Sequence, residues 1–412
     1  MPRPLGSFPE LARGPHVAPG RDSRRSAGGN PIIPKSDLPK FALFIADLGG
    51  GGAERVFVNL AKALWQRGYA VDLVVGTLDG AAYLDELPCG VRLVNLQVNR
   101  MAFGGPSLIR YLRRERPSAI LATRVHSSCL AVLARQFSGV RTRVIVRESN
   151  MVGPGLQAMM PVRRLAFSLA IRYCYPRADH VIAVSRGVAA ELNGQFGVLW
   201  GKLSVVYSPI ISDALQNRAS EPLGHEWFRE GQPPVILSVG RLTAQKDQQT
   251  LIRAFALVRK NVVARLLILG EGENRAELEA LVSELGLALD VSLLGFRENP
   301  FAFMARARLF VLPSAWEGLP GALIQALACG CPVVSTDCPS GPREILQDGR
   351  LGRLVPVGDP TNMAKAILES LSNGRKAPCG PEDLRPYTVE HSTREYLRIL
   401  LGEEAGLNGV MP

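Results

Sequence analysis

The chain is organised around one stretch, Ser314-Ala-Trp-Glu-Gly-Leu-Pro-Gly-Ala-Leu-Ile-Gln-Ala-Leu-Ala-Cys-Gly-Cys-Pro-Val-Val-Ser335. It follows the apolar run Leu309-Phe-Val-Leu312, which has the composition of a buried strand. Pro320 suits the first position of a helix, because its missing N–H costs nothing there and its fixed φ is helical. The stretch therefore predicts a strand, a short loop, a helix that ends at Gly330 and a second strand. Such a helix start offers free N–H groups at the carboxyl edge of a sheet, where an α/β protein can hold a diphosphate.

Apolar runs and helical segments alternate on both sides of this stretch. Residues 41–46, the glycines 49–52, an amphipathic segment at 53–68 and the apolar run 71–75 form a βαβ unit, which predicts a parallel sheet. The same alternation restarts at Val235 and runs to the central stretch. Since 412 residues exceed the usual size of one core, we expect two α/β domains.

Five separated motifs resemble those of the retaining nucleotide-sugar glycosyltransferases with the GT-B fold. They occur in the family's order and span most of residues 41–356. The resemblance implies two Rossmann-like, doubly wound domains that face each other across a cleft. The motifs are Gly49-Gly-Gly-Gly-Ala-Glu-Arg55, Ser238-Val-Gly-Arg-Leu-Thr-Ala-Gln-Lys-Asp247, Glu317-Gly-Leu-Pro320, Ala328-Cys-Gly-Cys-Pro-Val-Val-Ser335 and Gly341-Pro-Arg-Glu-Ile345.

The resemblance also implies a division of the chain. Val205-Val-Tyr-Ser-Pro-Ile210 is similar to the family's interdomain hinge, so we expect an acceptor-side domain at 39–208 and a nucleotide-sugar-binding domain at 209–387. A helix within 388–412 is expected to pack back on the first domain. Residues 1–38 are rich in Pro, Gly, Arg and Ser without apolar periodicity, which predicts a disordered tail and no signal peptide.

The motifs imply residues for the chemistry of glycosyl transfer. Arg241 and Lys246 match the family's phosphate pair, and both can meet the charge that develops on the departing diphosphate. Glu317 matches the donor-sugar ligand, and no Asp-x-Asp motif stands out at a strand end, so we expect a metal-independent reaction without a cofactor. The expected donor-binding residues are Gly51, Gly52, Gly318, Leu319, Pro320, Gly321 and Gln325.

Two positions depart from the family pattern. Gln325 stands eight positions after Glu317, where the family has a second glutamate. In the family, that glutamate accepts hydrogen bonds from the donor ribose. An amide can still accept through its oxygen, but it carries no charge, so donor binding is expected to be weaker or differently selective. Ser149 replaces a frequent histidine whose usual role is to contact the donor sugar or the acceptor.

Strand ends of the first domain supply candidates for contacts with the acceptor or the sugar. Side chains at the carboxyl ends of parallel strands meet ligands, which selects His126 and the segment Arg147-Glu-Ser-Asn150. For His126, a partly buried loop histidine is an equal alternative. The expected contacts are His126, Glu148, Ser149 and Asn150, with Arg147 as a further candidate.

Two other classes of function remain open at this point. An oxidoreductase would use the glycine loop and an acid about 20 residues later, which Asp72 supplies, but Glu54 and Arg55 interrupt the G-x-G-x-x-G spacing. A catalytically silent nucleotide-sugar-binding protein is favoured by Gln325 and Ser149.

The charge distribution bears on location and on partners. Residues 1–215 hold 27 Lys and Arg against 14 Asp and Glu, a net of +13, while residues 216–412 hold 21 against 23. Residues 159–173 combine arginines with apolar side chains, which indicates either an interfacial helix on anionic lipid or a helix buried between domains.

The remaining composition excludes several partners and sites. Basic residues are not interleaved with stacking aromatics, so no nucleic acid is expected. No segment approaches the roughly 18 apolar residues of a membrane span. Seven scattered cysteines without Cys-x-x-Cys predict reduced thiols and no metal site. We expect a cytoplasmic glycosyltransferase that acts on a cell-envelope glycan or lipid-linked acceptor, with contact at the inner face of the membrane as an accompanying hypothesis.

Overall fold

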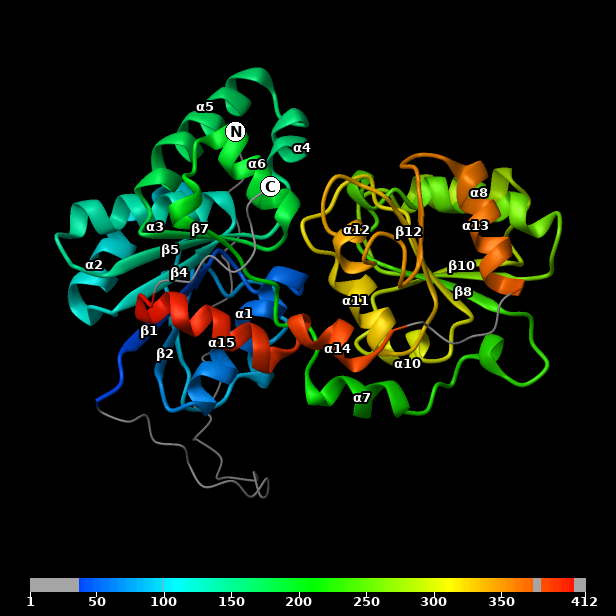
Figure 1. Cartoon of the computed structure of the whole chain (residues 1–412), viewed down its shortest axis with the longest axis horizontal. Coiled ribbons are helices and arrows are strands. Elements are labelled where there is room, and N and C mark those ends of the chain that lie inside the picture. Colours follow the sequence, from blue (N-terminus) through cyan, green and yellow to red (C-terminus); the bar gives the residue numbers. More distant parts are fainter. Residues whose placement is uncertain (1–36, 99, 373–378, 404–412) are drawn as a thin grey trace, which may run out of the picture. The chain divides into compact units, whose positions relative to one another are not determined.

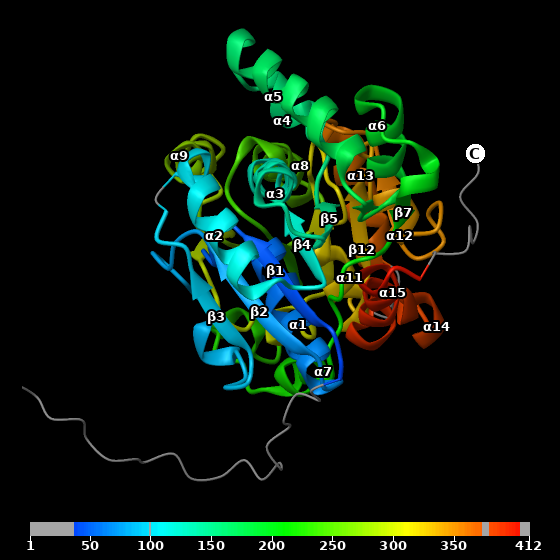
Figure 2. The same cartoon turned by 90° about the vertical axis from the view of Figure 1, so that its left-hand side faces the viewer.

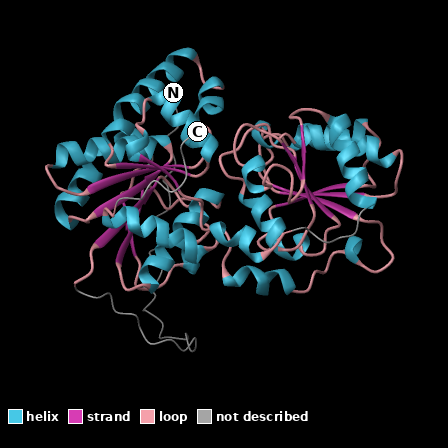
Figure 3. Cartoon of the chain, viewed as in Figure 1, coloured by secondary structure: helices cyan, strands magenta, loops and turns pink. Residues whose placement is uncertain are grey.

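The computed structural model describes residues 37–98, 100–372 and 379–403. These residues form two parallel β-sheets, each with helices on both faces (Figures 1 and 3). The predicted tail at 1–38 lies outside the described residues except for its last two positions, and so do residues 404–412 of the expected C-terminal segment.

The first sheet has seven strands in the order β3-β2-β1-β4-β5-β6-β7, and all its pairs are parallel. The strand order reverses between β1 and β4, and a ligand crevice in such a sheet opens beyond the carboxyl ends of the strands at this point. The strands are β1 (Lys40–Ile45), β2 (Ala70–Val75), β3 (Arg92–Asn95), β4 (Ala119–Thr123), β5 (Arg143–Glu148), β6 (His180–Ala183) and β7 (Leu203–Val205).

Alternate residues of β1 enter opposite cores, as the period of two in a strand requires. Ala42 and Phe44 join the core beneath the helices α2, α3 and α5, whereas Phe41 and Leu43 join the core beneath α1. The C-terminal helix α15 adds Tyr396 to that second core and packs against α1, as Figure 2 shows. The helices around the first sheet are α1 (Gly52–Gln66), α2 (Gly105–Glu115), α3 (Val125–Ser138), α4 (Val152–Gln157), α5 (Pro161–Cys174), α6 (Arg186–Phe196) and α15 (Val389–Leu401).

The second sheet has six parallel strands in the order β10-β9-β8-β11-β12-β13. The helices α8 and α13 cover one core of this sheet, and α10 and α11 cover the other. The strands are β8 (Val235–Val239), β9 (Arg265–Leu269), β10 (Val291–Gly295), β11 (Leu309–Leu312), β12 (Val333–Thr336) and β13 (Arg353–Val355). The helices are α7 (Asp213–Ser220), α8 (Gln248–Arg259), α9 (Arg275–Glu284), α10 (Phe301–Met304), α11 (Gly321–Ala328), α12 (Pro342–Ile345), α13 (Pro360–Ser372) and α14 (Pro381–Leu384).

The prediction of two doubly wound, parallel α/β sheets is confirmed. Around the central stretch the helix starts one residue later than predicted, because Pro320 has an extended ψ of 99° and Gly321 is the first helical residue. The segment before β8 contributes aromatic side chains to the core that α10 and α11 cover: the ring of Phe228 packs edge-on against Phe303 with centroids 5.9 Å apart, and Trp227 joins the same core.

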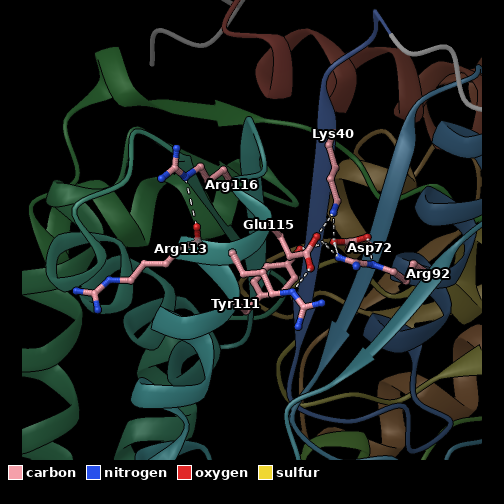
Figure 4. Close-up of polar contacts among 8 residues, drawn as sticks. Lys40, Asp72, Arg92, Tyr111, Arg113, Glu115 and Arg116 are labelled. Carbon is pink, nitrogen blue, oxygen red and sulfur yellow. Dashed lines mark hydrogen bonds and ion pairs between the residues drawn. The ribbon is translucent and has the colours of Figure 1, made fainter.

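Asp72 belongs to a buried ionic cluster (Figure 4). It accepts from Arg92 Nη2 at 2.5 Å and from the Tyr111 hydroxyl at 2.7 Å, and Lys40 Nζ lies 2.9 Å away. Glu115 also pairs with Arg92 and Lys40, which lower its pKa to about 2. Lys40 and Arg92 are the first residues of their strands, so this cluster lies toward the amino ends of the strands. Asp72 is therefore not placed to bind a ribose at the carboxyl edge. The oxidoreductase hypothesis is left without the acidic residue that would bind the ribose of its cofactor.

Replacing the buried carboxylate should weaken the first sheet. Asp72→Asn leaves Arg92 and Lys40 with one carboxylate instead of two, and we expect the free energy of unfolding to fall by about 2 kcal/mol. Urea denaturation measures this loss. Arg110→Ala on α2 is the control, since that side chain is exposed and should change stability by less than about 0.5 kcal/mol. Equal losses in the two variants would contradict the role of the cluster.

Candidate active site

The loops that follow β8 and β11 meet at the carboxyl edge of the second sheet, where these two strands are neighbours. Lys246 Nζ lies 2.5 Å from Glu317 Oε1, and the Ser314 hydroxyl donates to the same oxygen at 2.6 Å. Glu317 is only 5% exposed. The sequence thus brings a lysine and a carboxylate 71 positions apart into one buried ion pair.

Further hydrogen bonds fix these two loops to each other. The Ala315 N–H donates to the Gln245 carbonyl at 2.8 Å, and Gln245 Nε2 donates to the Trp316 carbonyl at 3.0 Å. Thr336 Oγ1, at the end of β12, donates to the Ser314 carbonyl at 2.5 Å. The geometry of the ion pair is therefore supported by three adjacent strand ends.

The turn that carries Lys246 is tight and uses glycine where the chain crosses itself. The aliphatic part of Lys246 passes over Gly240, and a Cβ on Gly270 would lie 1.9 Å from the Gly240 carbonyl oxygen. Asp247 then caps α8 by accepting from Thr250 N at 3.2 Å. Arg241 is exposed, and its side chain has no hydrogen bond or ion pair within the described residues. This guanidinium is free to bind an anion.

The start of α11 provides a second feature that suits an anion. No side chain caps this helix, and its first backbone bonds run from Leu323 and Ile324 to the Pro320 carbonyl. The N–H groups of Gly321 and Ala322 are left without a helical acceptor, at the positive end of the helix dipole. Gln325 lies one turn further on, half-buried, and its amide has no partner in the described part of the chain.

The first sheet approaches this loop at its β5 end. A Cβ on Gly318 would lie 2.3 Å from the Ser149 carbonyl oxygen and 2.6 Å from Asn150 Cα, so only glycine permits the contact. Ser149 and Asn150 are thereby placed beside Gly318, the residue that follows Glu317. Glu148 is 4% exposed and accepts from the Tyr175 hydroxyl at 2.7 Å and from Ser149 N at 3.0 Å. Burial raises the pKa of Glu148, and its oxygens are engaged within the protein.

Arg147 contradicts the expectation that it contacts a ligand. It is 1% exposed and donates to the Tyr396 hydroxyl at 2.8 Å and to Ser208 Oγ at 2.7 Å. This arginine joins β5 to α15 and to the segment after β7. Its place at the carboxyl end of β5 had made it a candidate for contact with a ligand, but its partner on the C-terminal helix is not evident from the local sequence.

The glycine loop before α1 lies at the switch point of the first sheet. Gly50 has a left-handed φ of +86°, and nothing lies within 4 Å of a Cβ placed on Gly52, so this part of the loop is open. A Cβ on Gly51 would lie 2.5 Å from Glu54 Oε2, because the Glu54 carboxylate lies beside the loop. Glu54 pairs with Arg124, the residue that follows β4.

His126 stands three residues after the end of β4, on the first turn of α3. Its ring packs edge-on against Phe167 of α5, with centroids 4.6 Å apart, yet it keeps an exposed face. Partial burial, followed by the charges of Arg124 and Arg163, lowers its pKa. Neither His126 nor Gly52 has a hydrogen bond to the loops of the second sheet within the residues described.

Sequence reasoning missed several residues that support the site. Ser314 donates to Glu317, and Ser340 Oγ donates to the Gly318 carbonyl at 3.0 Å. Glu344 accepts from the Tyr207 hydroxyl at 2.6 Å across 137 positions of sequence. Only the first of these has a local signal, as it sits three residues from the carboxylate that it serves.

Comparison with known proteins accounts for this arrangement. Residues 50–213 match the Glycosyltransferase Family 4 model, and residues 233–373 match the model described as Glycosyl transferases group 1. A Campylobacter jejuni protein is 32% identical over 352 residues, covering 82% of this chain and 92% of its own length. The chain belongs to this glycosyltransferase family. The Campylobacter protein is named N-acetylgalactosamine-N,N'-diacetylbacillosaminyl-diphospho-undecaprenol 4-alpha-N-acetylgalactosaminyltransferase.

Other relatives and solved structures place the glycosyltransferase among GT-B proteins. The lipopolysaccharide core biosynthesis glycosyltransferase LpsE of Rhizobium meliloti is 26% identical, over 85% of this chain and 96% of its own length. HepE from Anabaena, solved in complex with UDP, superimposes with a TM-score of 0.69 at 18% identity, over 89% of this chain and all of its own. The structural likeness supports the fold of the glycosyltransferase.

None of the helices described here has the length and apolar character to cross a membrane. Within the same residues, no group of three or more His, Cys, Asp and Glu side chains is gathered as metal ligands would be.

Removing either cation should slow the glycosyltransferase without unfolding it. Arg241→Ala and Lys246→Ala each remove charge that a departing diphosphate needs most in the transition state, so turnover should fall by about two orders of magnitude. Steady-state release of nucleoside diphosphate measures this effect. Arg253→Ala, an exposed arginine of α8, is the charge-matched control and should leave turnover unchanged. Near-normal turnover in both site variants would contradict the assignment.

Gln325→Glu should tighten nucleotide binding if residue 325 faces the ribose. A charged acceptor makes a stronger hydrogen bond than an amide, which corresponds to about threefold to tenfold in the dissociation constant. Calorimetric titration with UDP tests this expectation. Gln136→Glu, exposed on α3, controls for the added charge. A dissociation constant unchanged by Gln325→Glu would place this side chain away from the ribose.

Proposed function

We propose that this protein is a retaining glycosyltransferase that transfers a sugar from a nucleotide-sugar donor to a cell-envelope glycan or lipid-linked acceptor. The observation that carries the proposal is the buried Lys246–Glu317 pair with the unpaired Arg241 on the same loop. The printed names of the relatives support the acceptor class, since one acts on a diphospho-undecaprenol and another in lipopolysaccharide core biosynthesis.

The second domain, residues 209–387, would bind the donor. Arg241 is suited to a bidentate contact with the diphosphate, and Lys246 supplies a mobile point charge. An ammonium group has three N–H donors, so Lys246 can keep its bond to Glu317 while it reaches a phosphate oxygen. The free N–H groups at the start of α11, in the segment Gly318–Leu319–Pro320–Gly321, would add to this anion site, and Gln325 would contact the ribose.

Glu317 would bind the transferred sugar. Its oxygens can accept from ring hydroxyls, and its charge favours positive charge at the anomeric carbon. In the proposed reaction the acceptor hydroxyl attacks from the side of the leaving diphosphate, through an ion-pair-like transition state, and the configuration is retained. The preformed cations on the diphosphate would make the largest contribution, because the leaving group gains charge as the bond breaks.

The first domain, residues 39–208, would hold the acceptor and complete the donor site. Gly52 is the open part of the glycine loop and permits close approach of a phosphate, whereas Gly51 lies beside the Glu54 carboxylate and would contribute its backbone N–H. Ser149 and Asn150 lie against Gly318, so they are candidates for contact with the sugar or acceptor, as are His126 and Glu148. Glu148 would need to exchange its internal hydrogen bonds for such a contact, which makes it the least favoured of the four.

A panel of nucleotide sugars tests the proposed reaction. Radiolabelled UDP-glucose, UDP-galactose, UDP-N-acetylglucosamine, UDP-N-acetylgalactosamine and GDP-mannose are incubated with the protein, with and without a bacterial lipid extract. We expect hydrolysis or transfer of label with at least one donor, and little effect of EDTA. Binding of a nucleotide without turnover in any arm would favour a catalytically silent binder, the alternative supported by Gln325 and Ser149. Strong inhibition by EDTA that manganese reverses would contradict a metal-independent reaction.

Helix α5 supports the proposal that the enzyme works at a membrane surface. Its residues 162, 165, 169 and 173 recur at helical spacing, and all are exposed: Val162 by 81%, Leu165 by 62%, Leu169 by 57% and Tyr173 by 47%. Phe167 of the same helix does not join this exposed set, because its ring packs against His126. The alternative of a helix buried between domains is wrong for α5. The flanking cations are Arg163, Arg164 and Arg172, which are exposed.

Sedimentation with liposomes tests the membrane proposal. We expect the protein to pellet with anionic liposomes at low salt and to be released at high salt, because each basic residue near the surface contributes about 1 kcal/mol that salt screens. Arg163→Ala with Arg164→Ala should weaken pelleting. The matched control pairs Arg253→Ala with Arg394→Ala, two exposed arginines of other helices. Equal pelleting with neutral liposomes, or none at low salt, would contradict the proposal.

A further inference from the structure

The turn at the start of α6 contacts the loop that follows β12. Ser185 Oγ lies 2.6 Å from Ser340 Oγ, and the two residues are 0% and 4% exposed. Gly187 lies directly beside them: a Cβ placed on it would be 2.8 Å from Ser340 Cβ and 3.0 Å from the Pro339 carbonyl oxygen. The two hydroxyls can therefore meet only because residue 187 has no side chain.

Glu344 adds two hydrogen bonds between the loop after β12 and residues of the first domain. Its carboxylate accepts from the Arg186 N–H at 3.0 Å and from the Tyr207 hydroxyl at 2.6 Å. Arg186 adds an ion pair at 3.7 Å to the same carboxylate. The loop after β12 is thus held by the first sheet at Ser340 and again one helical turn later.

The same loop supports the backbone beside Glu317. The Ser340 hydroxyl donates to the Gly318 carbonyl at 3.0 Å. Gly341, with a left-handed φ of +93°, packs so closely that a Cβ there would lie 2.5 Å from Pro320 Cδ. Any shift of Ser340 would therefore be transmitted to the peptide that follows the catalytic carboxylate.

The available protons give this chain of hydrogen bonds one direction. The Ser340 proton is used on the Gly318 carbonyl, so Ser340 must accept from the Ser185 hydroxyl. Ser185 Oγ in turn accepts from Val188 N at 3.3 Å, as the cap of α6. Each oxygen both accepts and donates, an arrangement in which neighbouring bonds polarise one another. The relay runs from the amino end of α6 to the Gly318 carbonyl.

We infer that Ser185 and Ser340 are positioning residues of the transfer reaction, and that Gly187 allows them to meet because it has no side chain. Through this relay, contact of the first sheet holds the Gly318–Leu319 peptide, next to Glu317, in the place that a bound donor requires. The inference rests on the proposed function, which assigns Glu317 to the donor sugar. It adds a function for three residues that do not reach the donor themselves.

Gly187→Ala separates this role from a merely structural one. Gly187 does not have a left-handed φ, and alanine is the better helix former, so the substitution suits α6 itself. The atoms nearest to the new methyl group all belong to the loop after β12. We expect the melting temperature of the full chain to be unchanged or raised, while the relay is broken.

Hydrogen–deuterium exchange of the free enzyme is the decisive measurement. In Gly187→Ala, amides of residues 314–321 should exchange at least about threefold faster, although they lie far along the chain from the substitution. Gly194→Ala is the matched control on the same helix, where nothing lies within 4 Å of the added Cβ, and it should leave that segment unchanged. Unchanged exchange of residues 314–321 in Gly187→Ala would overturn the inference.

Ser340→Ala provides a second variant that does not depend on the added methyl group. It removes both bonds of the relay, so it should accelerate exchange of the same residues and lower kcat about tenfold or more, since small misplacements of reacting groups cost much rate. Affinity for UDP, measured by calorimetry, should stay near that of the unaltered enzyme. A lower UDP affinity with an unchanged kcat would contradict a positioning role.

The same set of variants distinguishes the failure of this inference from failure of the proposed function. Full turnover in Lys246→Ala would reject the donor-site assignment on which both depend. Loss of turnover in Lys246→Ala, together with normal exchange and normal kcat in Ser340→Ala and Gly187→Ala, would reject the relay alone.

Discussion

The Lys246–Glu317 ion pair is the interaction on which the proposed site depends. Burying two charges costs desolvation free energy, and a pair of this kind is weak support for stability unless its remaining hydrogen bonds are satisfied. Here Ser314 provides such a bond to the carboxylate, and Gln245 ties the two loops to each other. A packed apolar contact would stabilise the fold as well, and the pair suits the proposed role of Lys246 at the departing diphosphate.

Glycine has a different purpose on each side of this pair. Gly240 and Gly270 let the loops of the second sheet cross, whereas Gly318 lets the first sheet approach the loop that carries Glu317. The common physical reason is the absence of a Cβ where two backbones come within contact distance. Catalysis that relies on positioned groups needs such close approach, because a displacement of about 1 Å can cost a large part of the rate.

The basic charge of residues 1–215 and the exposed apolar side chains of α5 both suit the proposed contact with an anionic membrane surface. The excess of +13 lies in residues 1–215, and α5 adds apolar side chains that remain in solvent beside its arginines. An acceptor with a lipid anchor is confined to a surface, so an enzyme held there by reversible electrostatic contact would meet it more often. The second sheet, which is nearly neutral, would then meet its anionic donor through a few preformed cations.

The sequence by itself determined the alternation of buried strands and helices, and β8 begins at Val235, where the alternation was predicted to restart. Motif spacing also selected Lys246 and Glu317, which the fold brings together. Those signals are local, because a strand or a loop motif is written in consecutive residues. Only the tertiary structure decided that Asp72 and Arg147 are internal, that α5 is exposed, and that Ser185 meets Ser340 over 155 positions. Such contacts depend on the packing of distant segments. A hydrogen bond between two serines in different domains produces no periodic pattern of residues in either segment, so the sequence does not predict it.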